Sequence, residues 1–187
     1  VSRPADADTI LRINPHIAAH INGGPIPPAD GDVRRIIEES EAYLEIAYCG
    51  NARLAQKTVE WARDEGCLQR VILGTDTPSG TGVTPRGMLR IMALVAAVEG
   101  INPEQVMCMA TGSVGKAHEL ESGLLENGRL ADVLILGRIQ GASGNDALES
   151  LKDGNLLGIS MALIDGELVI KDRSRQTPPP EIGAVIL

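Results

Sequence analysis

The chain has 187 residues, a formal net charge of -8 and an isoelectric point near 4.9. An acidic chain without a basic run lacks the positive face that nucleic-acid phosphates require, so we expect no nucleic-acid partner. No apolar stretch approaches the roughly 18 residues of a membrane span, so we expect no membrane partner either.

The composition indicates an aliphatic core and a reducing compartment. Hydrophobic residues make up 43% of the chain, but only 2% are aromatic and Phe is absent. The three cysteines, Cys49, Cys67 and Cys108, are widely spaced and have no histidine pair nearby. This pattern predicts neither a disulfide framework nor a structural zinc site, and it favours the cytoplasm.

Strand and helix signals alternate in the first two thirds of the chain. The predicted elements are a short helix within 4–12, a strand at 17–19, a helix from 30, a strand at 43–48, a helix at 52–65, a strand at 71–74, a helix from 84 to 98 with Thr84 as its cap, and a helix from 102 to about 110. Helices of this length suit crossovers between parallel strands. The sequence therefore predicts an α/β fold with three consecutive βα units.

Beyond Gly123 the pattern changes. Helix signals become sparse, and two strand-like segments are joined at Asp165-Gly166, a pair typical of a hairpin turn. We therefore predict a domain boundary near residue 123, with one domain at 1–123 and a second at 124–187.

The segment 71–82, VILGTDTPSGTG, carries the sharpest functional signal. An apolar run closed by Gly74 is typical of a buried strand, and Asp76 follows its end. Loops at the carboxyl ends of parallel strands hold the binding and catalytic groups of α/β folds, so we interpret Asp76 as a functional residue. The alternatives are a turn or cap aspartate, or a phosphate-binding loop, although the segment lacks the G-K-[ST] ending of a P-loop.

Several segments together resemble a known family. The pattern G-x-L-x-x-G-x-x-A-D-x-x-I-L runs from Gly123 to Leu136, and AHINGGP, CGN, VILGTDTPSGTG, CMATG and IDGELVIKD add to it. These segments are similar to the amidohydrolase superfamily, and within it to the enamidase-like hydrolases of cyclic amides. The resemblance implies the C-terminal part of a (β/α)8 TIM-type barrel, about strands 6 to 8, followed by strands of a small β-sandwich domain.

The resemblance also implies a metal site. His20 falls at the position of the metal-binding histidine after barrel strand six, and Asp76 at that of the acid after strand eight, which binds metal and transfers protons. The metal expected is divalent, zinc and/or iron. From their position in neighbouring loops, Cys49, Asn51, Ser79 and Arg86 are candidates for contact with substrate, with helix capping an equal alternative for Asn51.

The implied reaction is hydrolysis of 6-oxo-1,4,5,6-tetrahydronicotinate to 2-formylglutarate and ammonia. The alternatives are another carbon-nitrogen hydrolase of the dihydroorotase, imidazolonepropionase or peptidase type, or an inactive fragment. The family's other metal ligands have no counterpart here, and a complete barrel takes about 250 residues. We therefore expect the N-terminal part of the barrel to be missing from this chain, and we expect a homo-oligomer.

Overall fold

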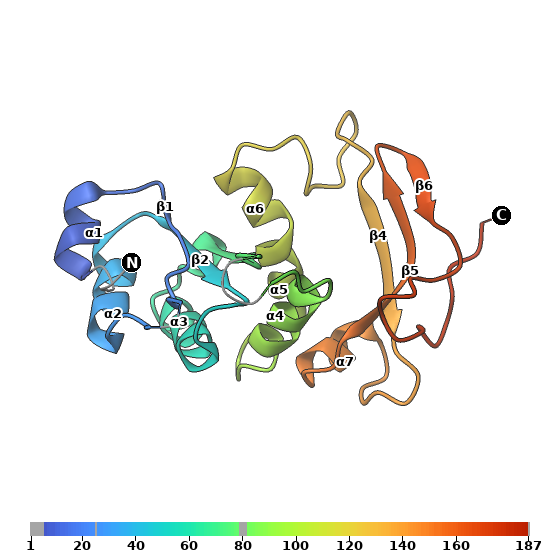
Figure 1. Cartoon of the computed structure of the whole chain (residues 1–187), viewed down its shortest axis with the longest axis horizontal. Helices are drawn as coiled ribbons and strands as arrows, with labels where there is room; N and C mark the ends of the chain where they lie inside the picture. The colour runs from blue at the N-terminus through green and yellow to red at the C-terminus, as the bar shows by residue number, and fades with distance from the viewer. Residues whose placement is uncertain (1–5, 25, 79–81, 187) are drawn as a thin grey trace.

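The computed structural model describes residues 6–24, 26–78 and 82–186. Two three-stranded sheets occupy different parts of the molecule, with helices between and beside them (Figure 1). The parallel sheet lies toward the N-terminal helices and the antiparallel sheet lies at the C-terminal end. None of the helices in the described ranges combines the length and apolar character that a membrane crossing needs.

The parallel sheet has the strand order β1-β2-β3. Its strands are β1 (Ile17–Ala18), β2 (Tyr43–Ala47) and β3 (Val71–Gly74). Leu44 pairs with Ala18 on one side and with Val71 on the other. Leu44 and Ile46 point to one face and are fully buried, whereas Tyr43 and Glu45, on the opposite face, are half-buried. The three βα units predicted from the sequence are therefore present in sequential order.

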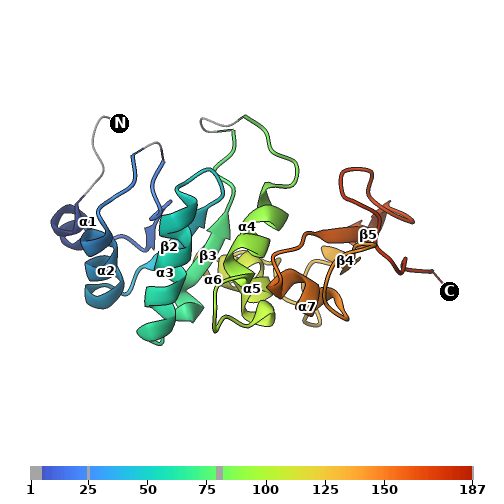
Figure 2. The ribbon, with the colours of Figure 1, turned by 90° about the horizontal axis from the view of Figure 1, so that it is seen from below.

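The helices between these strands cover one face of the sheet. Figure 2 shows α2, α3 and α4 side by side in front of it. The helices of this part are α1 (Ala7–Ile13), α2 (Asp30–Glu39), α3 (Ala52–Asp64), the 3₁₀ turn η1 (Leu68–Arg70), α4 (Gly87–Ala96), α5 (Pro103–Ala110) and α6 (Gly112–Ala117). Their apolar stripes bury Val33, Leu54 and Ile91 against the strands.

The antiparallel sheet follows the helices. It consists of β4 (Val133–Arg138), β5 (Leu157–Ile164) and β6 (Glu167–Ile170), with β5 in the middle. Asp165-Gly166 forms the predicted turn between β5 and β6, and both residues have positive φ. Helix α7 (Ala147–Lys152) precedes β5 and packs on α4 and α5, so Leu151 and Leu157 join the core of the parallel-sheet region.

The cap considered at Asn51 is present, and the cap predicted at Thr84 is absent. Asn51 caps α3 by accepting a bond from the Leu54 N–H, and Asn102 forms a capping box at α5. The predicted cap at Thr84 is wrong, because α4 begins only at Gly87. The Thr84 carbonyl instead accepts the Gly87 N–H at 2.8 Å and closes a turn, while its hydroxyl is buried without a hydrogen bond to the described residues.

Candidate active site

Three of the predicted site residues occupy equivalent places on neighbouring strands. His20, Cys49 and Asp76 each lie two residues beyond the last residue of β1, β2 and β3, respectively. Backbone bonds from Ile21 N to Glu45 O and from Tyr48 N to Gly74 O continue the sheet just past these strand ends. Since the strands are parallel and in order, the three residues gather at one edge, the carboxyl edge that carries function in α/β folds.

Cys49 and Asp76 are in direct contact. The Cys49 thiol donates a hydrogen bond to Asp76 Oδ2 at 3.0 Å and also lies 3.5 Å from the Asp76 carbonyl oxygen. Burial, followed by the hydrogen bond and negative charge of Asp76, raises the pKa of Cys49 to about 11. The thiol is therefore protonated near neutral pH and acts here as a hydrogen-bond donor to the acid rather than as a nucleophile.

Glu45 connects the His20 segment to the same edge. The His20 backbone N–H donates to Glu45 Oε2 at 3.2 Å. The other carboxylate oxygen, Oε1, lies over Gly74, where a Cβ would approach it to 2.6 Å. The negative charge of Glu45 also contributes to the raised pKa of Cys49. Two acids, Glu45 and Asp76, therefore lie near the carboxyl edge and both contribute to the raised pKa of Cys49.

The backbone of two candidate ligands is strained. His20 has φ of 36° and Asp76 has φ of 49°, in the left-handed region that residues with a side chain rarely adopt. Such conformations persist only where the surrounding structure enforces them, and they concentrate at functional sites. Asn14, Glu119, Asp165 and Asp172 also have positive φ, so this conformation agrees with a role for His20 and Asp76 but does not single them out.

The other predicted substrate contacts are less clearly placed. The side-chain oxygen of Asn51 is used in the α3 cap, where it accepts the Leu54 N–H at 2.9 Å. Arg86 is half-buried at the start of α4, and within the described ranges it forms no ion pair. Ser79 lies outside the described residues. Substrate contact by Cys49, Asn51, Ser79 and Arg86 therefore stays a prediction.

The described residues do not by themselves form a complete metal site. Among them, no three His, Cys, Asp or Glu side chains converge on a point where they could hold a metal ion. The His20 imidazole makes no hydrogen bond to Cys49 or Asp76 within the same ranges. A structural or catalytic metal ordinarily needs three or four protein ligands, so His20 and Asp76 can supply only part of such a site.

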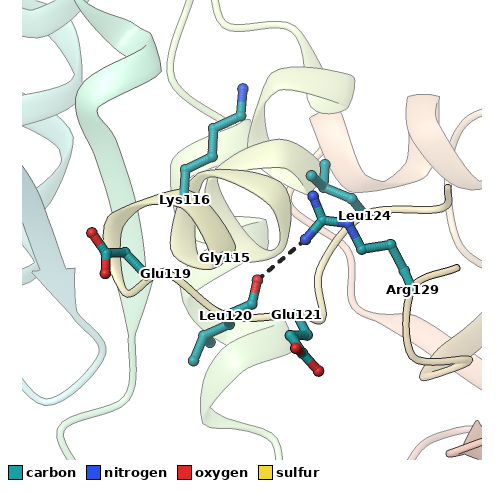
Figure 3. A pocket seen from close by; sticks show the side chains of 7 residues that line it. All are labelled: Gly115, Lys116, Glu119, Leu120, Glu121, Leu124 and Arg129. Atoms are coloured by element: carbon teal, nitrogen blue, oxygen red, sulfur yellow. Dashed lines mark hydrogen bonds between the residues drawn. The ribbon is translucent and has the colours of Figure 1, made fainter.

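A surface pocket lies elsewhere, beside α6. Its lining includes Lys116 and Arg129 together with Glu119 and Glu121, and Arg129 donates to the Leu120 carbonyl oxygen at 3.4 Å (Figure 3). These charged side chains are largely exposed, and the two signs of charge offset each other. We assign no function to this pocket.

Sequence reasoning missed two residues of the carboxyl edge. Glu45 is a lone acid inside the apolar strand YLEIA, and Asn22 follows His20 by two residues within the segment INGG. A single carboxylate in an otherwise apolar buried strand is costly unless it is used, and that signal could have identified Glu45. Asn22 is fully buried and contacts the Cys49 loop, which local sequence does not show.

Comparison with known proteins relates this chain and its fold to an enzyme. The chain is 40% identical over 186 residues to enamidase from Eubacterium barkeri; the match covers 100% of this chain and 48% of the enamidase. The crystal structure of enamidase at 1.9 Å resolution, described as a new member of the amidohydrolase superfamily, superposes with a TM-score of 0.94 at 39% identity and covers 100% of this chain and 49% of that one. No protein-family model matches the chain.

A more distant structure shares the fold alone. The β-aspartyl dipeptidase from Fervidobacterium islandicum superposes with a TM-score of 0.53 at 14% identity, covering 74% of this chain and 33% of that one. The chain spans about half the length of the curated relative it matches. The predicted fold, the C-terminal part of a TIM-type barrel followed by strands of a small β-sandwich domain, is confirmed by the superposition with enamidase, and the strands after the barrel form a small antiparallel sheet. The resemblance is confirmed with it: over its whole length the chain is a homologue of the C-terminal half of enamidase, a member of the amidohydrolase superfamily.

Proposed function

We propose that this chain is the C-terminal portion of a metal-dependent hydrolase that opens a cyclic amide, as an enamidase does. The substrate proposed is 6-oxo-1,4,5,6-tetrahydronicotinate, and the products are 2-formylglutarate and ammonia. Two waters are consumed: one opens the ring amide at its C–N bond, and the second releases ammonia from the enamine that ring opening leaves.

One observation carries the proposal. A chain that is 40% identical to enamidase along its whole length places His20, Cys49 and Asp76 at one carboxyl edge, each two residues beyond its strand. His20 and Asp76 also both have positive φ, a conformation that residues with a side chain rarely adopt.

The residues have distinct proposed roles. His20 and Asp76 hold a divalent metal, zinc or iron, together with ligands from the part of the protein that this chain does not include. When bound, the metal would supply activation of a water for attack on the ring carbonyl. Asp76 would take a proton from the attacking water and deliver it to the ring nitrogen as the C–N bond breaks. Arg86 and Ser79 contact the substrate carboxylate. The Cys49 thiol donates a hydrogen bond to the Asp76 carboxylate.

The test is Asp76→Asn in the full-length protein, with Asp165→Asn as the matched control. Both aspartates have φ of 49°, and Asn tolerates that conformation, so neither change should strain the backbone further. Asp165 lies in the turn between β5 and β6, away from the carboxyl edge. We expect Asp76→Asn to lower kcat by roughly 10²–10⁴-fold, the range for loss of a proton-transfer group, and Asp165→Asn to leave it unchanged.

Two results would overturn the proposal. Retained turnover in Asp76→Asn would remove its assigned role, and a full-length protein that contained no metal and hydrolysed no cyclic amide would refute the activity. Elemental analysis of the purified protein distinguishes zinc from iron. Turnover by residues 1–187 alone would contradict the need for the rest of the barrel.

The organisation of the protein is also a proposal. We divide the chain at residue 123, because the parallel sheet lies wholly before this point and the antiparallel sheet wholly after it. A homo-oligomer is proposed from the resemblance and is tested by light scattering of the full-length protein. The cytoplasmic location stays a prediction from the cysteine pattern.

A further inference from the structure

Asn22 joins the loop after β1 to the loop after β2. Its side chain is completely buried, and both ends of the amide are paired. Oδ1 accepts the Ala47 N–H at 2.9 Å, while Nδ2 donates to the Ala47 carbonyl at 2.9 Å and to the Asn51 carbonyl at 3.3 Å. The side chain thus imitates a strand neighbour of Ala47 at the point where the sheet ends.

The same residue also closes the loop that carries Cys49. The Asn51 N–H donates to the Asn22 carbonyl at 3.1 Å, so Asn22 bonds to both Ala47 and Asn51, the residues on either side of the turn. Gly50 packs directly against Asn22 and Gly23: a Cβ at Gly50 would lie 2.4 Å from Asn22 Nδ2 and 2.4 Å from the Gly23 carbonyl oxygen. The turn has no room to shift toward Asn22 and is bonded at both ends.

Cys49 lies within this closed turn, and its thiol reaches Asp76 Oδ2 across the edge of the sheet. We propose that Asn22 is a positioning residue that sets Cys49 against Asp76. Asn22 itself is buried behind the turn and touches neither Cys49 nor Asp76 through its amide. It acts by fixing the backbone on both sides of Cys49, and it lies two residues from His20, so one buried amide ties the His20 loop to the Cys49–Asp76 pair.

This inference rests on the proposed function, because the placement of Cys49 matters for catalysis only if Asp76 is catalytic. The placement of Cys49 by Asn22 can nevertheless be measured without an activity assay. The measurement is the alkylation rate of Cys49 by iodoacetamide in the folded, chelator-treated full-length protein at one fixed pH, read by mass spectrometry of tryptic peptides. Cys49, Cys67 and Cys108 fall in separate tryptic peptides, 36–53, 64–70 and 91–116. Exposed Cys108 is therefore an internal reference for the Cys49 rate.

Asn22→Ala is compared with Thr58→Val. Thr58 is also completely buried, and its hydroxyl donates to the Leu54 carbonyl at 2.7 Å inside α3, so its loss removes a buried hydrogen bond without touching the turn. Both variants should unfold at lower temperature. We expect Asn22→Ala to raise the Cys49 rate about tenfold relative to Cys108, because a released turn gives the reagent access to the thiol, and Thr58→Val to leave it unchanged.

Asn22→Asp is the second variant, in case Asn22→Ala does not fold. It keeps the shape of the side chain and an acceptor for the Ala47 N–H, but its carboxylate cannot donate to the Ala47 and Asn51 carbonyls, so the Cys49 rate should rise here too. Equal Cys49 rates in the Asn22 variants and in Thr58→Val would overturn the positioning role whatever the turnover of the protein. An inactive but otherwise normal wild-type protein would refute the proposed function and leave the positioning result intact.

Discussion

Gly50→Ala tests whether the loop after β2 is as tightly closed as its contacts indicate. The added Cβ would lie 2.4 Å from the Asn22 amide nitrogen and 2.4 Å from the Gly23 carbonyl oxygen, whereas ordinary van der Waals contact begins at 3.4 Å. The overlap is therefore about 1 Å, and one of the two atoms belongs to the backbone. Relief by rotating a flexible side chain is not available, so the turn itself must move.

The expected cost follows from that overlap. Overpacking of a close-fitted site costs about 1–3 kcal/mol. For a chain of this size, about 2 kcal/mol lowers Tm by roughly 4–8 °C, which circular dichroism on heating resolves easily. Gly31→Ala is the matched control, because Gly31 lies inside α2 and a Cβ there meets nothing within 4 Å. That change should stabilise the protein by about 0.5–1 kcal/mol, since Gly is unfavourable inside a helix.

The two glycine variants should therefore move Tm in opposite directions. If Gly50→Ala unfolded at the same temperature as the unsubstituted protein, the turn could accommodate a Cβ at residue 50. That result would refute the claim that the turn is closely packed against Asn22 and Gly23. A fall in Tm for both variants would instead show that any added methyl group destabilises this protein.

Two further predictions concern protonation. The hydrogen bond from Arg53 holds the pKa of Asp30 below its ordinary value, so the stability this pair contributes is present above the unfolded pKa of about 3.9 and is lost as the pH falls through the folded value. The stability difference between the unsubstituted protein and Arg53→Gln, measured by urea unfolding, should accordingly shrink in strong acid and in high salt. Burial and then Asp76 raise the pKa of Cys49 to about 11, so the alkylation rate of Cys49 should still increase with pH above pH 10. Asp76→Asn should shift this increase in rate to lower pH, and Asp165→Asn should leave it unchanged.

Much of the fold was predictable because its signals are local. Asn51 and Asn102 cap helices through bonds to residues three positions away, which a sequence pattern can show. Thr84 followed by Pro85 fits the same pattern, yet α4 begins at Gly87. A Cβ at Gly87 would lie 2.9 Å from Thr84 Oγ1 and within 3.3 Å of Tyr48, so the first residue of this helix is closely packed against Tyr48, which follows β2, a contact that the local sequence does not show.

The candidate site was predictable in part for the same reason. Asp76 stands out because it follows a continuous apolar strand, and that signal lies in the six consecutive residues from Val71 to Asp76. Glu45 had a local signal, as a lone acid in an apolar strand, but its contact with the His20 backbone is 25 positions away in the chain. Asn22 was missed because its role arises only from contacts as distant as Ala47, also 25 positions away. Nothing in the local sequence distinguishes Asn22 from an ordinary turn asparagine beside two glycines.

The left-handed backbone at His20 and Asp76 has a consequence for how this protein can evolve or be engineered. Gly at either position would relieve a backbone strain of order 1–3 kcal/mol, so a change that favours the backbone also deletes the side chain. Selection for stability and selection for the site therefore act in opposite directions at these two residues. A variant designed for stability from backbone preference alone would replace both His20 and Asp76. It would be more stable but would lack its candidate metal ligands.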